Sequence, residues 1–69
     1  MTPAAFKDWR LRNDLTQRGA AKLLGYSERQ IQSFESGFEK PGKPVKIPKA
    51  VSLACWAIEN GIEEWDGHS

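Results

Sequence analysis

The sequence predicts an all-α, compact domain of four to five short helices within 69 residues. Signals for a helix start recur along the chain, at Thr2, Thr16 and Ser27, because hydroxyl side chains accept hydrogen bonds from the first turn of a helix. Glycines then end two of these segments, at Gly25 and Gly37, where a left-handed backbone is needed. A chain this short buries only about 60% of its unfolded surface, so we expect one small core.

The first predicted helix carries two aromatic side chains and an arginine on one face. Thr2 caps it and a proline follows at the first helical position, where the missing N–H is harmless. Phe6, Trp9 and Arg10 then fall at helical spacing. An arginine on a core-facing surface needs an acidic partner, because an unpaired buried charge costs about 3–5 kcal/mol. We therefore assign Arg10 to structure.

Two short helices are predicted to meet across a tight turn at Gly25, within residues 16–37. Their apolar positions recur at helical spacing and would form the inner faces: Ala20, Ala21, Leu24, Ile31 and Phe34. A small residue is needed near the corner, since helices joined by so short a turn pack closely there. The second helix leaves a polar outer face formed by Glu28, Arg29, Gln32 and Ser33. The pattern is typical of a helix-turn-helix.

Charge is unevenly distributed. All ten Lys and Arg residues lie between Lys7 and Lys49, and the first 49 residues hold five acids, which leaves that part at +5. The four remaining acids follow it. The basic part contains the two-helix motif, as a phosphate-binding surface requires. The alternative is a solvated surface whose charges happen to be segregated.

Residues 37–47 are predicted to be a loop, because two prolines and a second glycine interrupt them. The loop carries three lysines at regular spacing, Lys40, Lys43 and Lys46. Prolines reduce the entropy lost when an extended backbone is held against DNA, so a phosphate-binding role is favoured. A plain linker, with lysines for solubility, is the alternative.

The last predicted helix, residues 48–60, is apolar on nearly all sides from Ala50 to Ile58. A helix apolar all round should be buried all round, and so short a chain cannot enclose it alone. We therefore expect a homodimer, with an interface formed by Leu53, Trp56, Ala57, Ile62 and Trp65. The alternative is that the acidic tail folds back over this helix within one chain.

Several functional classes find little support. His68 and Cys55 are the only histidine and cysteine and stand far apart, so neither a metal site nor a Cys–His nucleophile is expected. No catalytic constellation or phosphate-cradling GxxxxGK[ST] motif is present, so we expect no enzyme, cofactor or small-molecule ligand. The sequence also lacks a membrane-spanning or signal-peptide pattern, and the lone cysteine fits a cytoplasmic protein.

The motif residues resemble those of the Cro and phage-repressor (XRE-type) helix-turn-helix family, over roughly residues 6–58. The resemblance lies in Leu15-Thr16-Gln17, Leu24-Gly25 and Phe34-Glu35-Ser36-Gly37. It implies a lambda-repressor-like DNA-binding fold. It also implies an ion pair between Arg10, seven residues before Gln17, and Glu35.

The same resemblance implies how DNA would be bound. The second motif helix would lie in the major groove with its first residues at base edges. Base reading would fall to Glu28, Arg29, Gln32 and Ser33, with Arg29 matched to the two acceptors of guanine. Phosphate contacts would come from Gln17, Arg18, Ser27, Ser36, Lys40, Lys43 and Lys46.

Within that family, the short chain and the late Ile47-Pro48 preceding an Ala-rich helix resemble small autoregulatory repressors of phages and mobile elements. These include repressors encoded beside anti-CRISPR genes. The resemblance thus implies a homodimer that binds a palindromic double-stranded DNA operator. Two alternatives remain: an antitoxin-type repressor, and a protein-interaction module built on the same fold.

Overall fold

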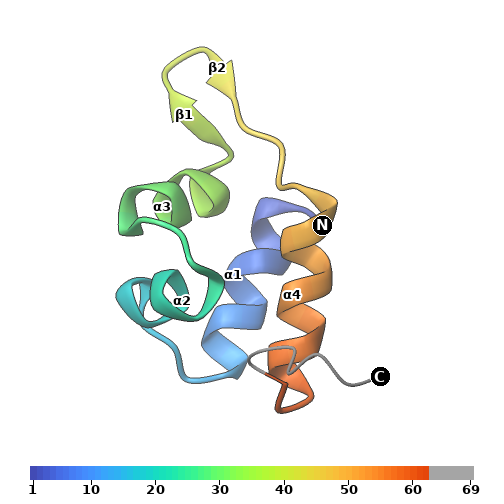
Figure 1. The fold of residues 1–69 in the computed structure, drawn as a ribbon. Coiled ribbons are helices and arrows are strands. Elements are labelled where there is room, and N and C mark those ends of the chain that lie inside the picture. Colours follow the sequence, from blue (N-terminus) through green and yellow to red (C-terminus); the bar gives the residue numbers. More distant parts are fainter. Residues whose placement is uncertain (63–69) are drawn as a thin grey trace.

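The computed structural model describes residues 1–62, which form a mostly helical domain with one two-stranded sheet (Figure 1). The helices are α1 (Pro3–Arg12), α2 (Gln17–Leu24), α3 (Glu28–Ser36) and α4 (Lys49–Glu59). Strands β1 (Phe38–Lys40) and β2 (Lys43–Pro44) form a hairpin between α3 and α4. The hairpin projects from one end of the helical part.

The predicted helix starts are confirmed by their cap hydrogen bonds. Thr2 Oγ1 accepts from the Ala5 N–H at 3.1 Å, and Thr16 Oγ1 accepts from the Gly19 N–H at 2.9 Å. Ser27 Oγ accepts from the third residue of α3 at 3.1 Å. The two predicted glycine stops are also confirmed, because both end their helices in the left-handed region, at φ 75° and 84°.

The core lies where α1, α3 and α4 meet the short α2. Its buried apolar residues come from all four helices and the segment before α4: Phe6, Trp9, Ala20, Ala21, Ile31, Phe34, Ile47, Val51 and Cys55. The ring of Phe6 contacts Trp9 and Phe34, with centroids 5.5 and 5.6 Å apart, and the second contact is edge-to-face. Such contacts add to the stabilisation that the buried area provides.

Helices α1 and α4 lie side by side and run in the same direction (Figure 1). The buried indole N–H of Trp9 donates to the carbonyl of Cys55 at 2.9 Å. One turn further along both helices, Arg12 forms an exposed ion pair with Glu59. The Trp9 bond satisfies a buried donor and fixes the register of the two helices.

The prediction that residues 37–47 form only a loop is wrong, and with it the expectation of a purely α-helical domain. Lys40 pairs with Lys43 across the hairpin, and the connection is Pro41-Gly42. Proline at the second position of the turn and Gly42 at φ 80° are the signature of a type II turn. The hairpin is also anchored to α3, because the Val45 N–H donates to the Gly37 carbonyl at 2.9 Å.

Gly19, the third residue of α2, stands close to the helix cap. A Cβ atom at this position would lie 3.2 Å from Thr16 Oγ1 and 3.7 Å from Leu15 Cδ2. Glycine therefore leaves room for the cap hydroxyl that its own N–H donates to. Alanine at this position would have the higher helix propensity, but its Cβ atom would crowd the cap hydroxyl, so the advantage of alanine over glycine is reduced here.

Candidate nucleic-acid interface

Helix α3 is held by its inner face, which leaves a polar outer face open. Ile31 and Phe34 are buried in the core, and the ring of Tyr26 lies edge-on to Phe34 with centroids 5.4 Å apart. The three-residue connection from α2 is further fixed by the Tyr26 N–H, which donates to the Ala21 carbonyl at 3.0 Å. The second helix of the motif is thus set rigidly against the first.

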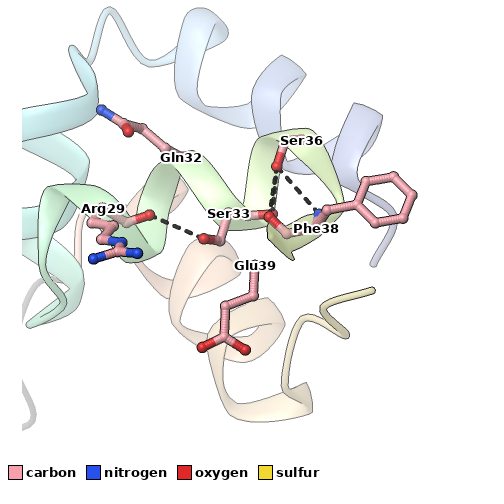
Figure 2. Close-up of a pocket in the computed structure, with 6 residues that line it drawn as sticks. All are labelled: Arg29, Gln32, Ser33, Ser36, Phe38 and Glu39. Atoms are coloured by element: carbon pink, nitrogen blue, oxygen red, sulfur yellow. Dashed lines mark hydrogen bonds between the residues drawn. The ribbon is translucent and has the colours of Figure 1, made fainter. Parts of the chain in front are cut away.

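A groove of about 310 Å³ runs along this outer face, between α3 and the start of the hairpin (Figure 2). Helix α3 provides four of its lining residues and strand β1 provides two: Arg29, Gln32, Ser33, Ser36, Phe38 and Glu39. In Figure 2 the side chains of Gln32 and Glu39 extend in opposite directions from α3, and Arg29 lies nearer the start of the helix. Three of the four predicted base-reading residues therefore line one groove.

The sequence pattern predicted that Ser33 points outward, and this prediction is wrong. Its side chain is buried, and its hydroxyl donates to the Arg29 carbonyl at 3.2 Å. A serine inside a helix readily turns back to the carbonyl one turn earlier. Ser33 thus forms the floor of the groove, and Arg29 and Gln32 are its exposed residues.

The first turn of α3 holds two charges of opposite sign. Glu28 Oε2 lies 3.7 Å from Arg18 Nε, in a largely exposed pair that bridges the starts of α2 and α3. Arg29 is exposed and forms no ion pair with any acid among residues 1–62. Its guanidinium is therefore available to a ligand without breaking an existing pair.

The predicted pair of Arg10 and Glu35 is present and nearly buried, with side chains 12% and 8% exposed. Arg10 donates through Nε at 2.5 Å and through Nη2 at 3.1 Å, so the contact is bidentate. A third donor, Nη1, reaches the Leu15 carbonyl at 2.9 Å. The hydrogen bond to Glu35 raises the pKa of Arg10, with burial acting in the opposite direction.

Gln17 lies beside this ion pair. Its side-chain amide donates to Glu35 Oε1 at 3.5 Å, at the first position of α2. Glu35 thereby holds both Arg10 and Gln17, which ties the start of α2 to the end of α3. The side-chain amide of Gln17 is therefore oriented by a contact within the protein.

The remaining predicted phosphate ligands fall into two groups. Lys40, Lys43 and Lys46 are exposed on or beside the hairpin, and Lys43 Nζ lies 3.2 Å from Glu39 Oε2. The hydroxyls of Ser27 and Ser36 are engaged within the protein, the first as the α3 cap and the second with the carbonyls of Ser33 and Phe38. The lysines are freer to bind a phosphate than these serines are.

The predicted dimer residues lie on or just beyond α4. Leu53 and Trp56 are 60% and 63% exposed, and Ile62 is 49% exposed. Ala57 is half-buried and accepts at its carbonyl from the Ile62 N–H at 2.8 Å. Trp65 lies outside the described residues. Leu53 and Trp56 stand three positions apart on α4, so their exposed side chains are neighbours on the helix surface.

Sequence reasoning missed the two β1 residues of the groove, Phe38 and Glu39. Helical periodicity ends at Gly37, so no pattern placed either residue beside Arg29. The fixed position of Phe38 comes from Ser36, whose hydroxyl accepts from the Phe38 N–H at 3.2 Å. The ring of Phe38 extends past the end of α3, whereas the carboxylate of Glu39 extends away from α3 in a different direction (Figure 2).

Residues 1–62 contain no cluster of three His, Cys, Asp or Glu side chains that could hold a metal ion. In the same part of the chain, no helix combines the length and the apolar character needed to cross a bilayer. No family model, curated protein or solved structure matches this chain.

Proposed function

We propose that this protein is a sequence-specific transcriptional repressor that binds double-stranded DNA through a helix-turn-helix formed by α2 and α3. The observation that carries the proposal is the outer face of α3, where exposed Arg29 and Gln32 border a groove next to a lysine-bearing hairpin. An α-helix fits the major groove, and guanidinium is the side-chain group that matches guanine there.

The packing of α2 against α3 supports this proposal. A recognition helix must be presented at a fixed angle. Here Gly25 ends α2 at the turn into α3. Gln17 of α2 donates to Glu35 of α3, and Glu35 also pairs with Arg10 of α1. Gly25, Gln17 and Glu35 are among the residues that carry the resemblance to the Cro and phage-repressor family, and that resemblance implies the pairing of Glu35 with Arg10. The start of α2 would meet a phosphate through Gln17 and Arg18, where the helix dipole favours an anion.

The charge distribution supports a phosphate-binding role for the hairpin. Lys40 and Lys43 lie on the hairpin whose first strand lines the groove, and Lys46 follows the second strand by two residues. Each phosphate contact would add affinity that is independent of sequence and falls with salt. The hairpin would thus follow the DNA backbone beside the groove that α3 enters.

A homodimer is part of the proposal. Leu53 and Trp56 are exposed on α4, and a second copy would cover them. A twofold dimer would place its two recognition helices about 34 Å apart, or a multiple of it, and would bind a palindromic operator. We further propose that the protein is cytoplasmic and autoregulatory, of the phage or mobile-element type that its resemblance implies.

Mobility shifts of the full chain with a pool of random-sequence duplexes test this function. We expect a shift that weakens as salt rises, followed on repeated selection by enrichment of a palindromic site. DNA upstream of the chain's own coding sequence is the first natural duplex to test. Absence of any shift at micromolar protein and low salt would contradict DNA binding and favour the protein-interaction alternative.

A further inference from the structure

Glu39 places a carboxylate in a groove that is otherwise suited to an anionic ligand. Glu39 and Arg29 line the same groove from two different elements, β1 and α3 (Figure 2). A carboxylate close to DNA phosphates is repelled, so it lowers affinity for DNA of any sequence. That penalty is offset only where the carboxylate finds a hydrogen-bond donor on the DNA itself.

Glu39 can leave its ion pair with Lys43 with little loss of stability. Lys43 Nζ lies 3.2 Å from Glu39 Oε2, but the two side chains are 59% and 53% exposed. An ion pair this exposed contributes little to stability, because water screens it and ordering two flexible side chains costs entropy. Lys43 can therefore turn to a phosphate while Glu39 turns to a base.

The donors of the major groove narrow the choice of base. Only the exocyclic amino groups of cytosine and adenine donate there. Adenine sets its amino group beside the N7 acceptor, which repels a carboxylate, whereas cytosine has no acceptor on that edge. We propose that Glu39 is a second base-reading residue, which accepts a hydrogen bond from a cytosine amino group while Arg29 binds guanine.

This inference rests on the proposed DNA-binding function and makes a separate claim about one position of the operator. Glu39 would raise specificity, because it would favour DNA with cytosine at the base pair that it contacts and would lower affinity for all other sequences. Arg29 attracts any DNA through its charge. The two residues therefore have opposite effects on non-specific binding, and that difference can be measured.

The test compares Glu39→Gln with Asp8→Asn in the full chain. Asp8 is a matched control, because it too is exposed and paired with a basic residue four positions along, Arg12, but it lies on α1. Each variant and the wild type are used to select sites from random duplexes. Their affinities for the wild-type site and for a scrambled duplex are then titrated, and thermal melting monitors folding.

We expect Glu39→Gln to change the preference at one position from cytosine to adenine, because an amide both accepts and donates and so matches the amino group and N7 of adenine. The variant should keep the guanine preference. Its affinity for the wild-type site should fall about 5- to 100-fold, as for a lost base contact, while its affinity for scrambled DNA should rise. Asp8→Asn should select the wild-type site. The inference is overturned if Glu39→Gln selects the wild-type site, or if it weakens all DNA equally. If the wild type binds no duplex, the proposed function fails and this inference with it.

Discussion

Glu35 accepts hydrogen bonds from both Arg10 and Gln17 through a single oxygen, Oε1, at 3.1 and 3.5 Å. Its other oxygen accepts from Arg10 Nε. One carboxylate at the end of α3 thereby joins α1 to the start of α2. This arrangement links stability to the proposed site. The Gln17 amide, which would donate to a phosphate, is hydrogen-bonded to the same Glu35 carboxylate that pairs with Arg10.

Removing one partner of this pair should destabilise the domain strongly. Arg10→Met leaves Glu35 buried without its main donor, which costs about 3–5 kcal/mol. A domain of this size is stable by only roughly 3–10 kcal/mol. We therefore expect a large fall in the urea midpoint of Arg10→Met, and a partial recovery in the double variant Arg10→Met/Glu35→Leu.

For Arg10→Met, which keeps Glu35 and its contact with Gln17, DNA affinity should fall only as far as folded protein is lost. Binding is measured at a temperature where circular dichroism shows the variant to be folded. An Arg10 variant with wild-type stability and no DNA binding would mean that Arg10 touches DNA, and the structural assignment would have to be abandoned.

Base contacts and phosphate contacts should be separable by mutation. Arg29→Ala is expected to cost about 1–3 kcal/mol at the selected site and much less on scrambled DNA. Lys46→Ala should weaken both DNAs similarly and reduce the salt slope by about one unit. Titrations of both duplexes at several salt concentrations measure the difference. Equal losses for Arg29→Ala on both duplexes would make Arg29 a phosphate ligand.

The exposed side chains of α4 should determine the oligomeric state. Trp56→Glu and Leu53→Glu replace side chains that are 63% and 60% exposed, so the core of each chain should stay folded. We expect the wild type to sediment as a dimer and both variants as folded monomers. Leu11→Glu, which alters an equally exposed leucine on α1, is the control and should leave the dimer intact.

A wild-type chain that sediments as a stable monomer at micromolar concentration would contradict the dimer. In that case a palindromic operator would no longer be expected. The alternative would then be that the acidic tail folds back over α4 within one chain and buries its apolar side chains.

Cys55 should make the protein less stable at alkaline pH. Burial raises the pKa of its thiol to about 11, and Glu59 acts in the same direction. The folded chain keeps the thiol proton at a pH where the unfolded chain releases it. The contribution of the protonated thiol to the free energy of unfolding is therefore complete below about pH 8.5 and is lost as pH rises toward 11. The loss should amount to about 2–3 kcal/mol across that window.

Urea unfolding of the wild type and of Cys55→Ala at pH 8 and pH 10.5 measures this effect. The alanine variant lowers stability at both pH values through its smaller volume, so the informative quantity is the change with pH. The wild type should lose more stability than the variant over this range. Equal losses would show that the Cys55 thiol is not the group responsible.

The sequence could predict the helices and most of the core because their causes are local. Cap hydroxyls at Thr2, Thr16 and Ser27 accept hydrogen bonds from residues three positions away, so each helix start is encoded within one turn. Spacing alone then indicated the buried side chains of each helix. The hairpin was missed because proline and glycine mark a turn but do not show whether its flanks will pair.

The groove between α3 and β1 required the tertiary structure. Arg29 and Gln32 could be placed on an outer face from helical spacing, but that spacing did not show that Ser33 is buried and donates to the Arg29 carbonyl. Glu39 could not be placed at all, because its position beside Arg29 follows from the path of the chain after Gly37.

By itself the sequence determined where helices begin and end, which faces are apolar and where basic charge gathers, because these follow from neighbours within a few residues. Only the tertiary structure decided which of these features meet. Trp9 bonds to Cys55, and Glu39 shares a groove with Arg29, because packing brings together groups that are remote in the chain or carried by different elements. Such contacts depend on the whole fold, and no local pattern encodes them.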